Sequence, residues 1–168
     1  MADTPTEPIQ MKVFIDNPAG MSTKNLYNEK TLEYLRSVTV STPYPFPYGF
    51  FLNTTSGDGD NLDCFVITSK NIHQAEIVNV EPLGLMEVVE NGEIDHKVIA
   101  QLVGEKIELS DTIKQTLIEF IQTVFSHLPE KHMSIGDFLP RESAIKAIRD
   151  AQDFDSAAPR DDSHYNEV

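Results

Sequence analysis

The chain has 168 residues, with 27 acidic and 13 basic side chains and a formal net charge of −14. This length suits one domain with a substantial core, and the acidic excess without a basic patch argues against nucleic acid or an anionic membrane surface as a partner. The single Cys64 excludes a disulfide within the chain, and with no signal peptide or membrane span in the sequence we expect a soluble, cytoplasmic protein.

The first part of the chain alternates extended segments with turns. Residues 1–10 are polar and carry two prolines, which predicts a flexible lead-in. A strand is predicted at 11–15, ended by the turn signal Asp-Asn-Pro at 16–18, and a second extended segment at 31–40. Between 43 and 49 three prolines alternate with other residues, which excludes helix and sheet interior and predicts a stiff segment that presents tyrosines.

An acidic turn follows. Asp58, Asp60 and Asp63 fall within six residues, directly before the apolar run 64–68. Asp63 is predicted to begin a core strand, with the other two aspartates on the turn that leads into it. Carboxylates this close repel one another unless a cation lies between them, and hard divalent cations such as Mg²⁺ take oxygen ligands. A solvated acidic turn remains a second interpretation, because Asp, Gly and Asn are common turn residues.

More strands come next, and then the pattern becomes helical. Strands are predicted at 74–80, 83–89 and 97–103, the last two joined by the hairpin signal Asn91-Gly92.

Apolar residues at helical spacing predict a helix that begins at Ser110 or Asp111 and ends before Pro129, and a second helix is expected to start near Pro140. We expect one domain, residues 11–150, followed by a disordered acidic tail over 151–168.

The hairpin at 90–97 carries a second cluster of carboxylates, with Lys97 behind it. If the strands curl into a small barrel, this hairpin can face the acidic turn across the barrel mouth. Carboxylates, a lysine and nearby tyrosines suit Mg²⁺ ions together with a phosphate-rich ligand. Taken alone, the cluster fits a solvated hairpin equally well.

Four short segments occur in a fixed order along the chain, at 16–18, 44–49, 58–63 and 90–97. They resemble, respectively, the Glu-x-Pro, Tyr-Pro-x-Asn-Tyr-Gly, Asp-x-Asp-Pro-apolar-Asp and Asp-x-Gly-Glu-x-Asp-x-Lys motifs of the soluble family I inorganic pyrophosphatases. The resemblance covers residues 11–103, with weaker agreement to about 151.

The resemblance implies a β-rich α+β fold, a small OB-like closed β-barrel with two flanking α-helices. It implies an inorganic diphosphatase that uses several Mg²⁺ ions, or Mn²⁺ or another divalent cation, and forms a homo-oligomer. Water then attacks one phosphorus of inorganic pyrophosphate, without a covalent intermediate, and two orthophosphates leave. Two closely spaced metals would activate that water.

Residue roles follow from the same resemblance. The general base implied is Asp60. The metal ligands implied are Asp58, Asp63, Asp95, Glu90 and, as an outer ligand at the rim, Asp16. The phosphate contacts implied are Lys24, Arg36, Tyr48 and Lys97.

The chain departs from the family pattern at several positions. Asn61 replaces a proline, which predicts a loss of rigidity, and Pro47 replaces an asparagine. The family's Tyr-Lys pair after the long helix is absent, since residues 124–126 read Val-Phe-Ser. Lys131 or His127 are the candidates to replace it. These departures keep an alternative open, a catalytically weakened metal- and phosphate-binding or regulatory module.

Overall fold

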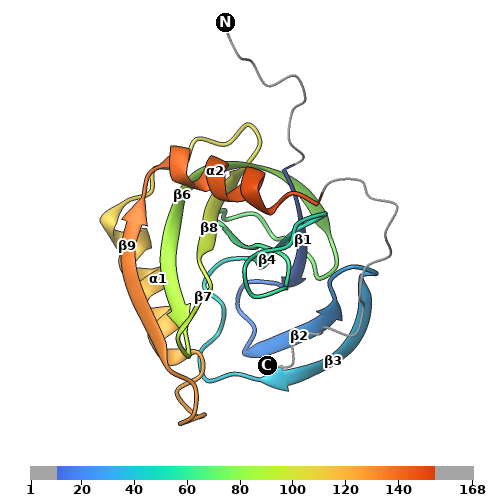
Figure 1. The fold of residues 1–168 in the computed structure, drawn as a ribbon, viewed down its shortest axis with the longest axis vertical. Coiled ribbons are helices and arrows are strands. Elements are labelled where there is room, and N and C mark those ends of the chain that lie inside the picture. Colours follow the sequence, from blue (N-terminus) through green and yellow to red (C-terminus); the bar gives the residue numbers. More distant parts are fainter. Residues whose placement is uncertain (1–10, 154–168) are drawn as a thin grey trace, which may run out of the picture.

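The structure is a computed structural model that describes residues 11–153. The expected lead-in at 1–10 and the part of the expected tail beyond 153 lie outside the described residues. Within 11–153 the strands are β1 Lys12–Asn17, β2 Thr23–Asn28, β3 Glu33–Thr39, β4 Tyr48–Phe51, β5 Asp63–Val66, β6 Ile77–Glu90, β7 Glu93–Ile94, β8 Lys97–Leu102 and β9 Met133–Leu139. The helices are α1 Asp111–Thr123 and α2 Arg141–Ala151 (Figure 1).

Five strands form a sheet that returns on itself. The pairs run β1–β4, β4–β5, β5–β8, β8–β6 and finally β6–β1, so each strand of this ring has two neighbours. All of these pairs are antiparallel except β5–β8, which is parallel. The small β7 and the outer β9 both pair with β6. The prediction of a β-rich, barrel-like domain with two helices is thereby confirmed.

Close contacts between strands constrain the ring. A Cβ on Gly49 of β4 would lie 1.9 Å from the carbonyl oxygen of Phe14 in β1, so only glycine allows these two strands to approach this closely. In β6 the register shifts between Pro82 and Gly84, where proline supplies no N–H for the ladder. The shift lets one long strand contact β1, β8 and β9 in succession.

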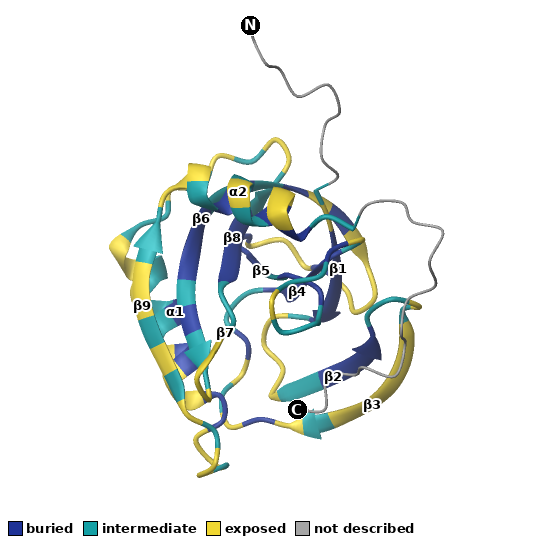
Figure 2. Cartoon of the chain, in the orientation of Figure 1, coloured by how far each residue is buried: buried dark blue, intermediate teal, exposed yellow. Residues whose placement is uncertain are grey.

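The two helices cover separate cores. Ser110 caps α1, as predicted, because its side chain accepts a hydrogen bond of 3.2 Å from the Ile113 N–H. α1 packs against the β5–β6–β8 side through Leu117 and Phe120, and α2 covers a second core through Ile148. Figure 2 shows the buried residues along the ring strands and the exposed ones on β3. Over residues 11–153, neither helix is both long and apolar enough to cross a membrane.

Some predicted elements need correction. The two strands expected at 74–80 and 83–89 are one strand, β6, since the register shift near Pro82 bends it without ending it. β2, β7 and β9 were not predicted. β2 carries several polar residues, and β9 contains a glycine and pairs with β6. The Asn91-Gly92 turn joins β6 to the short β7, and the strand predicted at 97–103 is β8, which follows β7. Pro140 precedes α2 as its N-cap rather than lying in its first turn.

Candidate active site

Strand ends and loops from both halves of the chain meet around one pocket. It is a cavity of about 220 Å³ bounded by the β4–β5 loop, the β6–β7 hairpin, β2, β8 and the C-terminal part of α1. Its charged lining residues are Lys24, Asp58, Asp60, Asp63, Glu90, Glu93, Asp95 and Lys97. Tyr44 and Tyr48 also line it. The structure therefore brings together every predicted site residue except Asp16 and Arg36.

Lys97 lies at the centre of the charged side. Asp63 begins β5 and Lys97 begins β8, and the parallel register sets these two residues opposite each other. The Lys97 Nζ donates to Oδ2 of Asp63 and to Oδ2 of Asp95, at 2.8 Å in both cases. It also lies 5.5 Å from the centre of the Tyr48 ring. One buried ammonium thus bridges two carboxylates of the pocket lining.

The charges in this cluster perturb one another. Burial raises the pKa of Asp63 to about 6, with Asp95 adding to the shift and Lys97 opposing it. Burial disfavours the ammonium of Lys97, but Asp63 and Asp95 hold its pKa well above the usual value. Burial lowers the pKa of Lys24, and Lys97 lowers it further. The raised pKa of Asp63 therefore comes mainly from burial, which the nearby ammonium of Lys97 offsets only in part.

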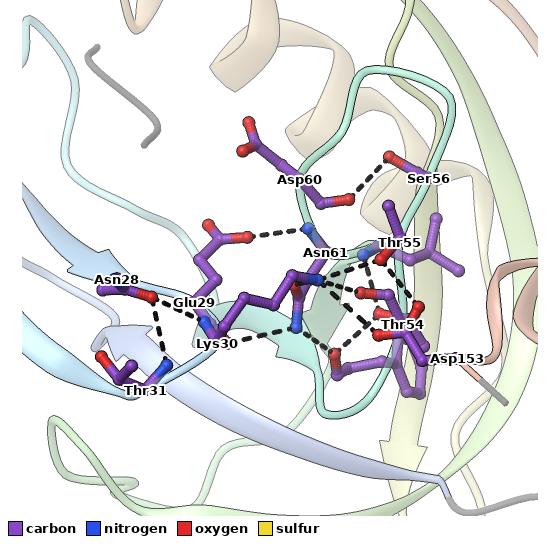
Figure 3. A network of polar contacts seen from close by, with 12 residues as sticks. Asn28, Glu29, Lys30, Thr31, Thr54, Thr55, Ser56, Asp60, Asn61 and Asp153 are labelled. Atoms are coloured by element: carbon purple, nitrogen blue, oxygen red, sulfur yellow. Dashed lines mark hydrogen bonds and ion pairs between the residues drawn. The ribbon is translucent and has the colours of Figure 1, made fainter. Parts of the chain in front are cut away.

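The acidic loop between β4 and β5 is held by its own hydrogen bonds. Oδ1 of Asp58 accepts from the Ser56 hydroxyl at 2.6 Å and from the Asp60 N–H at 3.0 Å. The Ser56 N–H donates to the Asp60 carbonyl oxygen at 2.7 Å. Gly59 has a φ of +91°, a conformation that glycine adopts readily. Asp58 is therefore engaged within the loop, while the Asp60 side chain extends away from these bonds (Figure 3).

The β6–β7 hairpin brings Glu90 to the opposite side. Its turn is Asn91-Gly92, and both residues have positive φ, as the hairpin prediction requires. Glu90 pairs with the ammonium of Lys131, from the segment before β9. That ammonium lies 4.9 Å from the centre of the Phe125 ring, and Lys24 Nζ lies 5.3 Å from the same ring. A cation therefore does stand near the position of the missing pair.

Two predicted residues lie outside the pocket lining. Asp16, on β1, is 7% exposed, so its expected place at the rim is wrong: the chain buries it. Burial raises the pKa of Asp16, and the charge of Asp63 raises it further, so the two carboxylates interact. Arg36 is exposed on β3. Their functional roles stay predictions.

One acidic residue was missed by the sequence reasoning. Glu29 follows β2 at a turn, where no motif marks it, yet its Oε1 accepts the N–H of Asn61 at 2.9 Å. Burial raises the pKa of Glu29, and Asp63 and Asp60 raise it further. Only the tertiary pairing of the β2–β3 turn with the acidic loop could have identified it.

The lining matches divalent cations in its donor chemistry. Aspartate and glutamate oxygens dominate one side, and these are the ligands that Mg²⁺ and Ca²⁺ prefer. Within residues 11–153, no three acidic, histidine or cysteine side chains converge closely enough to form a ready metal-binding group. The donor types of the lining thus suit a hard divalent cation, while in this arrangement the ammonium of Lys97 lies between Asp63 and Asp95.

Known proteins of one family are similar to this chain. The sequence model for inorganic pyrophosphatase matches residues 13–154. The inorganic pyrophosphatase of Nanoarchaeum equitans is 30% identical over 155 residues, which cover 86% of this chain and 97% of that protein. That of Halalkalibacterium halodurans is 30% identical over 152 residues, covering 84% and 93%.

Solved structures agree in fold. An inorganic pyrophosphatase structure from Coxiella burnetii superposes with a TM-score of 0.77 at 25% identity, covering 83% of this chain and 91% of that one. The structure from Thermus thermophilus gives a TM-score of 0.79 at 21% identity, covering 90% and 94%. The arrangement of ring strands and helices is therefore shared across these proteins.

Proposed function

Because this chain belongs to the inorganic pyrophosphatase family, we propose that its pocket hydrolyses inorganic pyrophosphate to two orthophosphates. The observation that supports this most directly is the set of carboxylates around Lys97 in one pocket. A phosphoanhydride needs cations on its oxygens and a base for the attacking water, and both kinds of group line this cavity. No observation favours the alternative of a binding or regulatory module.

We propose Mg²⁺ as the main metal, in several copies. Asp58, Asp63 and Asp95 would hold the ions nearest the reaction, with Glu90 and Asp16 as further ligands. When bound, such ions lower the pKa of a shared water, orient it and neutralise charge on the phosphoryl oxygens. Asp63 is suited to this role, because burial and Asp95 disfavour its negative charge and a cation relieves that cost.

Asp60 is the proposed general base. Its backbone N–H holds Asp58 in place, so its own position is set within the loop before substrate arrives. A water oxygen attacks one phosphorus, Asp60 accepts a proton from that water, and the bond from phosphorus to the bridging oxygen breaks. The electron pair stays on the departing phosphate, and no bond to the protein forms.

Basic side chains and a tyrosine bind the phosphate oxygens in this proposal. Lys24 and Lys97 line the cavity, and a charged ammonium away from bulk water attracts an anion more strongly than one in water. Tyr48 packs beside Lys97 and can offer its hydroxyl. Arg36 joins them if the β2–β3 hairpin moves toward the pocket. From family membership we also propose that the protein is cytoplasmic and forms a homo-oligomer. Light scattering on the purified protein tests the oligomeric state.

The deciding experiment measures phosphate release from pyrophosphate. With millimolar Mg²⁺ the purified protein should release phosphate, and EDTA should abolish that release. Parallel reactions with Mn²⁺ and Ca²⁺ establish the metal preference. The Asp60→Asn variant serves as a folded, inactive control. Release no faster than a protein-free blank with all three metals would exclude the proposed hydrolysis.

A further inference from the structure

The turn after β2 contacts the acidic loop through Glu29 and Lys30 (Figure 3). Lys30 Nζ donates to the Thr54 carbonyl oxygen at 2.7 Å, to the Thr55 hydroxyl at 3.0 Å and to Oδ1 of Asn61 at 2.5 Å. These bonds match in number the three donors of an ammonium group. Asp153, near the C-terminal end of the described chain, lies 3.8 Å from the same nitrogen.

Asn61 is bonded on every side. It is 2% exposed, and its backbone N–H donates to Oε1 of Glu29 at 2.9 Å. Its Nδ2 donates to the Phe51 carbonyl oxygen at 2.9 Å and to the Glu29 carbonyl oxygen at 3.4 Å. A proline here could make none of these bonds, because it has neither an N–H nor an amide side chain. The expected loss of rigidity at this position is thus offset by directional contacts.

The position of Asn61 gives these contacts their significance. It directly follows Asp60 in sequence, so Glu29 holds the peptide unit that joins it to the proposed base, through the Asn61 N–H. Lys30 holds the side-chain oxygen of the same Asn61. The other end of the loop is tied as well, since the Leu62 N–H donates to the Thr54 hydroxyl at 3.0 Å. Lys30 also bonds Thr54, so one ammonium connects both ends of the loop.

We propose that Lys30 is a positioning residue, which together with Asn61 forms a clasp that holds the acidic loop in its working geometry. Lys30 does not line the pocket, so it acts on the reaction through Asp60 and not through substrate. The catalytic consequence rests on the proposed function, whereas the restraint on the loop does not. A displacement of about 1 Å at a reacting group can lower a rate by about 10²-fold.

The first test follows hydrogen–deuterium exchange in metal-free protein. Lys30→Met removes the charge and the hydrogen bonds but keeps an unbranched side chain of similar length. Amides of the peptide covering residues 56–62 should then exchange about tenfold faster than in wild type, because the loop opens more often. Lys70→Met is the matched control. Lys70 also forms an ion pair, with Glu105 at 4.0 Å, but neither residue belongs to this loop. Unchanged exchange in Lys30→Met overturns the proposal.

The second test separates kcat from KM. Lys30→Met should lower kcat by about 10²-fold and leave KM for pyrophosphate within about threefold of wild type, because the phosphate contacts stay in place. The Lys30→Met and Asn61→Ala changes should be strongly non-additive in kcat, since both release one loop. A kcat equal to that of Lys70→Met overturns the catalytic part of the proposal. If wild type itself releases no phosphate, the proposed function fails, and the exchange result alone decides whether Lys30 holds the loop.

Discussion

The two walls of the pocket are held by different forces. One wall consists of the acidic loop, β5 and β8, where hydrogen bonds and ion pairs fix charged side chains at distances between 2.6 and 3.0 Å. The other wall comes from α1, the turn after it and β9, and its pocket residues are apolar: Phe120, Ile121, Val124, Phe125 and Met133. Directional polar contacts hold the first wall, and apolar packing holds the second.

The difference predicts what each wall contributes. Packed apolar surface tolerates changes of shape at moderate cost, because burial depends mainly on area. Charged groups away from water need partners with defined geometry, and losing one partner leaves the other exposed to the full cost of desolvation. We therefore expect changes on the charged wall to alter chemistry and metal dependence, and changes on the apolar wall to alter substrate affinity.

The largest effect is expected at Asp60. Asp60→Asn keeps the size of the side chain but removes the base, so kcat should fall by roughly 10²–10⁴-fold. Asp63→Asn should also raise the Mg²⁺ concentration needed for half of the maximal rate, because it removes a proposed ligand. Steady-state kinetics across a Mg²⁺ titration measures both quantities, with exposed Asp137→Asn as the control. Identical effects of the two pocket variants on both quantities would contradict the separate roles.

The next effect concerns the stability of the charged wall. Lys97→Met leaves Asp63 and Asp95 close together without their shared ammonium. Removal of one partner from a buried pair costs about 3–5 kcal/mol, so urea unfolding in EDTA should show a loss of this size. Saturating Mg²⁺ should restore most of it. Lys146→Met breaks an exposed pair and should change stability by less than about 1 kcal/mol. Equal losses of unfolding free energy in both variants would mean that the Lys97 pairs stabilise the fold no more than an exposed ion pair does.

Metal binding should stabilise the fold by an intermediate amount. A cation that binds only folded protein adds about 2.7 kcal/mol at a hundredfold excess over Kd, which raises Tm by several degrees in a chain of this size. Sodium chloride at matched ionic strength should not do so, because screening supplies no coordination. In the Asp58→Asn, Asp63→Asn double variant, Mg²⁺ should have little effect. Equal changes in the Tm of wild type with both salts would show that the carboxylates form a charged surface and do not bind the metal.

The smallest effect tests the apolar wall. Lys131 lies over Phe125 and pairs with Glu90, so it is placed to replace the missing Tyr-Lys pair as a phosphate contact. Lys131→Ala should raise KM for pyrophosphate by about tenfold, roughly 1.4 kcal/mol, with a smaller change in kcat. Neither lysine lines the pocket, but Lys131 pairs with the lining residue Glu90. Lys114→Ala is the control, because Lys114 lies 5.6 Å from the centre of the ring of Phe138, which is not a lining residue. An unchanged KM would show that Lys131 makes no phosphate contact and that this wall contributes only apolar packing.

The sequence predicted the charged wall well, for a physical reason. Its carboxylates form two short clusters, at 58–63 and 90–95, which are visible in the sequence, and Asn91-Gly92 specifies its hairpin. Their roles at the site were implied by the family resemblance. The cap of α1 was likewise local. The contacts of Asn61 were not, because Lys30 and Glu29 lie about 30 residues away in sequence and meet it only in the folded chain. Asp16 was misplaced because nothing in the local sequence distinguishes a carboxylate at the rim from a buried one.

The parallel pairing of β5 with β8 has a consequence for how the molecule assembles. Parallel neighbours need a long connection, and here it contains β6, itself a strand of the ring, and β7, both of which precede Lys97 in the chain. Contacts between residues so distant in sequence carry a loop-closure cost that local helices avoid, and such topologies fold slowly. α1 can form early, whereas the pocket exists only once the ring has closed. Recovery of activity during refolding therefore reports closure of the strand ring.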